Sequence, residues 1–154
     1  MPDTEFVSHS SEETIAFGRE LARSLAPPRL VLLSGDLGSG KTTLSKGIIS
    51  GLGAAREEDV TSPTFTLVHV FRNHATVYHV DLYRVEQFRD LETLGLEDAL
   101  SEPAIVVIEW SERFSLQSDW PRLLVHLEHL EGDMRRITIC ESASESAGAA
   151  PHRA

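Results

Sequence analysis

The sequence predicts an α/β protein in which a mostly parallel central sheet carries antiparallel hairpins and lies between layers of helices. Two short, uninterrupted apolar runs, residues 30–33 and 104–108, are typical of strands buried on both faces of a parallel sheet. The first run leads through a glycine-rich turn into residues 42–52, where apolar side chains recur with helical spacing. A strand, a turn and a helix in this order form the repeating unit of α/β folds.

A further helix is predicted ahead of the first apolar run. It begins at Ser10, because Glu13 stands three residues later, as in a capping box, and apolar residues then recur at every fourth position. Pro27 and Pro28 end it, since proline lacks the backbone donor that a helix interior needs.

The other predicted elements are mainly hairpins. Strand-like residues 65–71 and 76–82 are separated by a short connection, and residues 123–130 and 136–140 flank a glycine turn. Each of these pairs is expected to be antiparallel. Residues 86–100 have the composition of a helix.

The length and composition fit one domain. A chain of 154 residues with 41% hydrophobic side chains fills a single core, and we expect this domain over residues 1–141. Residues 142–154 hold no large apolar side chain, so burial cannot offset the entropy of ordering them. We expect a disordered C-terminal tail there.

Charge and apolar pattern restrict the partners and the compartment. A formal net charge of −10 disfavours direct binding of nucleic acid, although it suits solubility or a basic partner protein. The apolar runs are far shorter than the about 20 residues of a membrane helix, and residues 1–5 do not resemble a secretory signal. Because the single Cys140 cannot form an internal disulfide, a reducing compartment fits, and we expect a cytoplasmic protein without membrane contact.

The glycine-rich turn carries the clearest chemical signal. Residues 35–42 match the P-loop pattern G-x-x-x-x-G-K-[ST] in full, between a buried strand and a helix start. Its backbone amides and the helix N-terminus attract phosphates, while Lys41 bridges the β- and γ-phosphates and the Thr42 hydroxyl ligates Mg2+. A glycine turn with a chance lysine is the alternative, which the strand–loop–helix context disfavours. The predicted nucleotide-binding residues of this segment are Asp36, Leu37, Gly38, Ser39, Gly40, Lys41, Thr42 and Thr43.

An acidic residue stands where a P-loop NTPase fold would place a site carboxylate. Glu109 follows the apolar run 104–108, at the carboxyl end of a central strand, where ligands of open α/β sheets bind. It is a candidate to hold Mg2+ directly or through water, or to polarise the attacking water, and the alternative is an ordinary strand-end glutamate. The guanine-reading sequence Asn-Lys-x-Asp is absent, which favours ATP over GTP.

Other polar clusters leave two interpretations open. Alternation places His79, Asp81 and Tyr83 on one face of a strand, which is either a solvated surface or part of a site. The hydroxyls of residues 61–65 suit a loop that senses the γ-phosphate, and equally an ordinary turn into a strand.

Four motifs together resemble the TsaE family, also called YjeE. They are Gly-Asp-Leu-Gly-Ser-Gly-Lys-Thr-Thr from Gly35, Ser-Pro-Thr-Phe-Thr from Ser62, His-Val-Asp-Leu-Tyr-Arg from His79 and Ile-Glu-Trp from Ile108. The resemblance covers roughly residues 10 to 140. Many unrelated enzymes share a P-loop, whereas the four motifs in this order are specific. Ser39 departs from the family, which often has alanine there.

The resemblance implies an ATPase, weak alone and stimulated by partners, that acts with TsaB and TsaD. Its pathway is the biosynthesis of N6-threonylcarbamoyladenosine beside the anticodon of ANN-decoding tRNAs, and tRNA is reached only through the complex. By the same resemblance Lys41 and the loop bind phosphates, Thr42 and Glu109 hold magnesium, and Asp81 is a catalytic carboxylate. Trp110 and Arg136 are expected to approach the nucleotide.

Two other functions compete with this one. A small P-loop kinase would use the same loop to phosphorylate a metabolite, but it needs an arginine-bearing lid, and residues 86–103 hold only Arg89. A nucleotide-gated binding module would use ATP only to order residues 61–65 for a partner. ADP formation that requires an added acceptor distinguishes the kinase.

Overall fold

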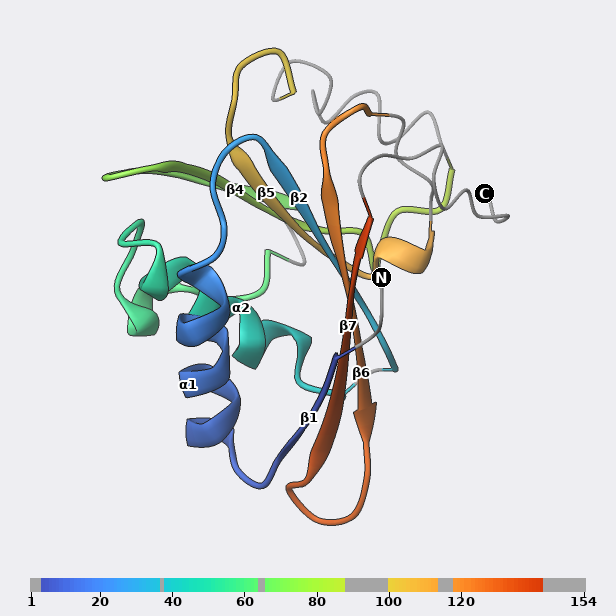
Figure 1. Ribbon diagram of the computed structural model, residues 1–154. Helices are drawn as coiled ribbons and strands as arrows, with labels where there is room; N and C mark the ends of the chain where they lie inside the picture. The colour runs from blue at the N-terminus through green and yellow to red at the C-terminus, as the bar shows by residue number, and fades with distance from the viewer. Residues whose placement is uncertain (1–3, 37, 64–65, 88–99, 114–117, 143–154) are drawn as a thin grey trace.

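The computed structural model describes residues 4–36, 38–63, 66–87, 100–113 and 118–142. In these residues a seven-stranded sheet and two α-helices form one α/β unit (Figure 1). The elements in chain order are β1 (Thr4–Ser8), α1 (Ser11–Ala22), β2 (Arg29–Ser34), α2 (Lys41–Gly51), η1 (Glu57–Asp59), β3 (Val68–Arg72), β4 (Thr76–Asp81), β5 (Ile105–Glu109), η2 (Ser111–Arg113), β6 (Arg122–His129) and β7 (Arg135–Ser142).

The sheet is parallel at its centre and antiparallel at both sides. Its order is β1-β7-β6-β2-β5-β4-β3, and β2 pairs in parallel with both β5 and β6. Strands β4 and β5 are also parallel, whereas β3 pairs antiparallel with β4, and β7 with β6. The predicted α/β class, the two apolar central strands and both hairpins are therefore confirmed.

Strand β1 was not predicted. It pairs antiparallel with β7, so that Phe6 lies opposite Ile137, and its Phe6 ring stacks on Phe17 of α1 with centroids 4.4 Å apart. The five residues of β1 show only a weak apolar pattern, and their partner strand lies at the other end of the sequence. Short-range periodicity therefore carries little signal for this strand.

Helices α1 and α2 lie side by side on one face of the sheet (Figure 1). They approach so closely that a Cβ on Gly47 would lie 2.2 Å from the Ile15 carbonyl oxygen, and one on Gly18 would lie 2.8 Å from the Leu44 carbonyl oxygen. Glycine is required at such backbone contacts because any side chain would push the helices apart. Leu44, with Ile48 and Ile49 of α2, fills the core between the helices and the sheet.

The N-terminus of α1 is capped at the predicted residue. The Ser10 hydroxyl accepts from the Glu13 backbone N–H at 3.1 Å. The Glu13 carboxylate, however, accepts from the backbone N–H of His9 at 2.7 Å, one residue earlier than a regular capping box requires. Both contacts fix the residues that lead into α1. The N-terminus of this helix lines the site described below.

The opposite face of the sheet carries a second apolar cluster. Leu30, Val80, Val106 and Ile108 lie at its centre, and Trp110 is among the side chains packed against it. The predicted helix 86–100 falls mainly on residues 88–99, which lie outside the described residues, as do residues 143–154 of the predicted tail. Strand β7 extends to Ser142, one residue past the predicted end of the domain. Among the described residues no helix has the length and apolar content to cross a bilayer.

Candidate functional site

The predicted P-loop connects β2 to α2 at the carboxyl end of the parallel strands. A Cβ on Gly35 would lie 2.4 Å from the Leu127 carbonyl oxygen, and Gly35 has a φ of 142°, so only glycine fits this close approach. Helix α2 begins at Lys41 after Gly40, and no side chain caps it in the described part of the chain. Its first amides therefore suit an anion, as the sequence predicted.

Lys41 is the buried cation of the loop. Its side chain is only 5% exposed, and Nζ donates to the Gly35 carbonyl at 2.6 Å, the Asp36 carbonyl at 2.9 Å and the Ser39 hydroxyl at 3.3 Å. The same ammonium lies 3.8 Å from the ring centroid of Trp110. The Ser39 hydroxyl, where the family often has alanine, is thus accommodated as an acceptor for the lysine.

The electrostatics of Lys41 combine two opposing effects. Burial lowers its pKa below the ordinary 10.5, because the charged form loses hydration. The negative potential of nearby carboxylates opposes this shift; they are Glu112, Glu109, Asp81 and Asp36. The site therefore combines a poorly hydrated cation with several carboxylates, and such perturbed groups often mark a functional site.

Glu109 and Thr42 meet at the base of the loop. Glu109 ends β5 opposite Leu33 of β2, and its side chain is 2% exposed. The Thr42 hydroxyl donates to Glu109 Oε1 at 2.8 Å. The other oxygen, Oε2, lies 2.6 Å from His79 Nε2 and 3.2 Å from the Ser45 hydroxyl. The structure therefore brings the two predicted magnesium ligands into contact.

This pair of residues fits a magnesium ion. The Thr42 hydroxyl and the Glu109 carboxylate are hard oxygen donors, and Mg2+ characteristically takes one or two protein ligands together with water and phosphate oxygens. The described residues include no group of three or more His, Cys, Asp or Glu able to hold a metal by themselves. A metal that arrives with a nucleotide needs no such group.

Asp81 lies beside Glu109 on the adjacent strand. The two residues are register partners of β4 and β5, and Asp81 is 2% exposed. Its carboxylate accepts from the Ser62 hydroxyl at 2.5 Å and from the Tyr83 backbone N–H at 2.8 Å. His79 and Asp81 therefore belong to a buried site, whereas Tyr83 lies beyond the strand end and is 42% exposed. Of the predicted loop 61–65, residues 64–65 lie outside the described residues.

Trp110, which the resemblance expects near the nucleotide, lies against Lys41 of the phosphate loop. Besides the Lys41 ammonium it contacts the Tyr83 ring, with centroids 4.9 Å apart. Its backbone has a φ of 66°, in the left-handed region that costs a non-glycine residue about 1 kcal/mol or more. This turn directs the chain after β5 back over the loop, into η2.

Glu112 of η2 was not predicted from the sequence. Its carboxylate accepts from the Gly35 backbone N–H at 3.2 Å and contributes first among the carboxylates that raise the pKa of Lys41. Nothing in the local pattern marks this residue, because its role depends on the turn at Trp110. Leu37, which the sequence assigned to nucleotide binding, lies outside the described residues.

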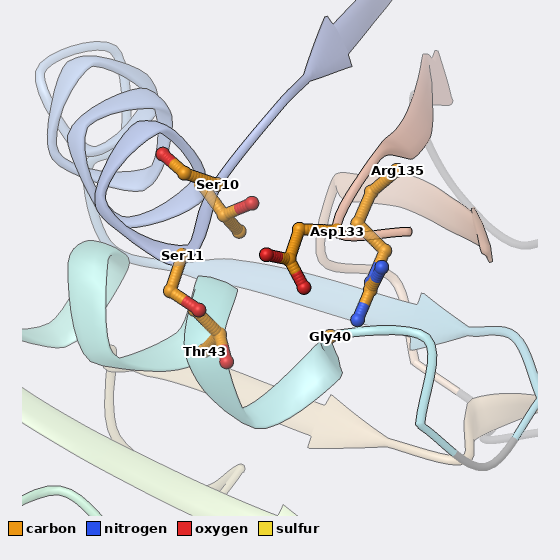
Figure 2. A pocket seen from close by; sticks show the side chains of 7 residues that line it. Ser10, Ser11, Gly40, Thr43, Asp133 and Arg135 are labelled. Carbon is orange, nitrogen blue, oxygen red and sulfur yellow. The ribbon is translucent and has the colours of Figure 1, made fainter. Parts of the chain in front are cut away.

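A polar pocket adjoins the start of α2. Figure 2 shows Asp133 and Arg135 on one side of it and Ser10 and Ser11 on the other, above Gly40 and Thr43. Three distant parts of the chain build it: the N-terminus of α1, the P-loop and the turn from β6 to β7. The predicted residue Thr43 thus lines a cavity that continues away from Lys41.

The structure does not bring Arg136 to this site. Arg136 forms ion pairs with Glu5 at 2.6 Å and with Glu128 at 2.8 Å, while Arg135 lines the pocket. A Cβ on Gly40 would lie 3.5 Å from Arg135 Nε. Successive side chains of a strand point to opposite faces, so Arg135 and not Arg136 lies on the side of β7 that borders Gly40. The candidate nucleotide-contacting arginine is therefore Arg135.

Comparisons with known proteins agree with the motifs. The family model described as "Threonylcarbamoyl adenosine biosynthesis protein TsaE" matches residues 8–137. A protein from Rickettsia bellii named tRNA threonylcarbamoyladenosine biosynthesis protein TsaE is 38% identical over 140 residues, which are 90% of this chain and 96% of the relative. A protein of the same name from Treponema pallidum is 35% identical over 133 residues, which are 86% of this chain and 97% of the relative.

A solved structure shares the fold. The crystal structure of YdiB from Bacillus subtilis superposes with a TM-score of 0.70 at 27% sequence identity. The match covers 96% of this chain and 90% of the solved one. The similarity in fold therefore extends over nearly the whole chain.

Proposed function

Because the chain belongs to the TsaE family, we propose that it binds and hydrolyses ATP with Mg2+ in the biosynthesis of threonylcarbamoyladenosine in tRNA. The observation that carries this proposal is the 2.8 Å hydrogen bond between Thr42 and Glu109, on a P-loop whose lysine is buried. The names of the relatives support the proposed pathway, and the geometry of the site supports the proposed chemistry.

The phosphates would bind over the first turn of α2. The present acceptors of the Lys41 ammonium are two backbone carbonyls and a hydroxyl, all uncharged. Phosphate oxygens carry charge and form stronger hydrogen bonds with an ammonium, so Lys41 would exchange these acceptors for the β- and γ-phosphates. The uncapped amides at the start of α2 add further donors.

Thr42 and Glu109 would hold the magnesium ion at the base of this loop, Thr42 through its hydroxyl oxygen and Glu109 directly or through water. When bound, Mg2+ neutralises charge on the β- and γ-phosphate oxygens. Asp81, the register partner of Glu109, retains the Ser62 hydroxyl and so keeps the loop from residue 61 onward near the reacting phosphate. This positioning is the role that we assign to Asp81.

The nucleoside would occupy the polar pocket next to Gly40. Ser10, Ser11 and Asp133 supply hydroxyl and carboxylate partners for the ribose and for the edge of the base. The Arg135 guanidinium is planar and suits the face of an adenine, since arginine stacks on aromatic rings. The pocket borders Gly40, so an ATP molecule whose phosphates lie on the P-loop would bring its nucleoside to these side chains.

Partner proteins would complete the function. With a formal net charge of −10 the chain is unsuited to bind tRNA alone, so we propose that it acts with TsaB and TsaD and meets tRNA only through their complex. ATP hydrolysis then supports turnover of the complex, while the partners carry out the chemistry on the adenosine.

The test measures ATP hydrolysis by the purified chain, alone and with TsaB, TsaD and substrate tRNA. We expect weak hydrolysis that rises with the partners and is lost in Lys41→Ala and Glu109→Ala. Lys46→Ala is the matched control, because Lys46 lies on the same helix but donates to the Val60 carbonyl on its far side. Hydrolysis unaffected by the partners, with ADP formed only after a metabolite is added, would instead identify a kinase.

A further inference from the structure

His79 is a fully buried imidazole that the proposed function leaves without a role. It lies on β4, is 0% exposed, and its Nε2 is 2.6 Å from Glu109 Oε2. Burying a polar ring inside the sheet costs free energy unless the ring forms a hydrogen bond. The contact therefore calls for a function, and this inference rests on the proposed magnesium and ATP site.

The direction of the hydrogen bond follows from the surroundings. The Glu109 carboxylate only accepts hydrogen bonds, so the proton of this contact belongs to Nε2 of His79. The other ring nitrogen, Nδ1, has no hydrogen-bond partner among the described residues. The hydrogen bond from Nε2 to Glu109 is therefore the contact that ties this ring to the site.

His79 is also the main donor to that oxygen. The Ser45 hydroxyl lies 3.2 Å from Glu109 Oε2, but it lies closer, at 2.9 Å, to the Lys41 carbonyl. The contact from His79 to this oxygen, at 2.6 Å, is shorter than the contact from Ser45. The carboxylate of Glu109 is therefore held at Oε2 by the imidazole, which leaves Oε1 directed at the Thr42 hydroxyl.

We propose that His79 is a positioning residue that fixes the rotation of the Glu109 carboxylate, so that Oε1 faces the magnesium that accompanies ATP. Groups that hydrogen-bond to a metal ligand commonly change the metal affinity, because they orient the ligand. The role concerns the metal and not the phosphates, because His79 makes no contact with the P-loop backbone in the described residues.

The test compares His79→Gln with His79→Asn. The amide nitrogen of glutamine extends about as far as Nε2, whereas that of asparagine reaches only the position of Nδ1, so the two variants bury similar polar groups but differ in the donor to Glu109. Binding of a non-hydrolysable ATP analogue is measured by calorimetry in EDTA and at increasing Mg2+. His69→Asn is the matched control, since His69 contacts the His79 ring edge-on from β3 without reaching the carboxylate.

We expect similar affinities in EDTA, while the Mg2+ concentration for half-maximal tightening rises about 10- to 100-fold in His79→Asn and about twofold in His79→Gln. His69→Asn should behave as the wild type. Equal Mg2+ midpoints in both His79 variants, or a loss of affinity that is already complete in EDTA, would overturn the positioning role. Wild-type binding that does not respond to Mg2+ would instead refute the proposed function itself.

Discussion

The Thr42 hydroxyl donates a 2.8 Å hydrogen bond to the Glu109 carboxylate, which joins the first turn of α2 to the end of β5. Both groups are oxygen ligands, and both are held by backbone elements of the parallel core. The site is thus preformed by the sheet, and the loop contributes mainly its amides and Lys41.

Thr42→Val removes the hydroxyl but keeps the shape of the side chain. We expect affinity for ATP with saturating Mg2+ to fall at least about tenfold, which corresponds to about 1.4 kcal/mol, because a ligand is lost and Glu109 loses a donor. Calorimetric titration measures this affinity. Thr42→Ser retains the hydroxyl and should remain near wild type; a Thr42→Val protein that binds as tightly as the wild type would show that the hydroxyl does not matter.

Arg135 and Arg136 provide a matched pair on consecutive positions of β7. Arg135→Ala should weaken ATP binding about tenfold, since a stacked guanidinium contributes on the order of 1–2 kcal/mol. Arg136→Ala should leave the affinity unchanged and lower stability by at most about 1 kcal/mol, because its ion pairs with Glu5 and Glu128 are at the surface. The opposite ranking in a titration would restore the original assignment to Arg136.

The buried charge of Lys41 makes stability depend on alkaline pH. Its pKa is lowered below 10.5 in the folded chain, so above the folded value the unfolded chain holds a proton that the folded chain has released. The free energy of unfolding therefore rises with pH across that window, up to 10.5. Lys41→Met, which has no ammonium to bury, should be more stable than wild type at neutral pH.

Urea unfolding of both proteins from about pH 7 to about pH 10 gives the measurement. The advantage of Lys41→Met should shrink as the pH rises. Lys46→Met controls for the loss of a lysine from α2 and should be destabilising, because the hydrogen bond of Lys46 to the Val60 carbonyl disappears. A stability advantage of Lys41→Met that is constant with pH would mean that burial does not lower the pKa of Lys41.

Gly47→Ala tests the contact between the helices. The added Cβ would lie 2.2 Å from the Ile15 carbonyl oxygen, so the helices must separate, at a cost of about 1–3 kcal/mol in the free energy of unfolding. Thermal and urea unfolding measure it. Ser50→Ala on the same helix is the control and should be close to neutral. A Gly47→Ala protein as stable as the wild type would contradict the close approach of the two helices.

Much of this site could be predicted from short, local sequence patterns. The P-loop, the strands at 30–33 and 104–108 and the glutamate that follows the second strand depend on residues near one another in sequence, and the structure has them as predicted. Whether His79 lies on a solvated surface or in a site was left open, because its contact with Glu109 depends on β4 being the neighbour of β5. Strand order is a property of the whole chain, and periodicity does not encode it.

The pocket was harder to predict for the same reason. Its walls come from residues 10–14, the P-loop and residues 133–135, which meet only after the sheet has formed. The alternation of β7 decides which arginine enters, and a loosely matched motif does not fix that register. Glu112 was missed because the turn at Trp110 adopts a conformation that side-chain patterns do not announce.

The pairing of β1 with β7 places Thr4 opposite Ile139, and so one edge of the sheet is formed by two segments from opposite ends of the described chain. During synthesis on a ribosome, β1 must wait until nearly all of the chain has emerged before its neighbour exists. Contacts of such long sequence separation also form late in refolding, because closing a long loop costs entropy before any pairing is gained. We therefore expect the pocket between Ser10 and Arg135 to assemble late, so that the proposed nucleotide site is complete only in molecules whose folding is complete.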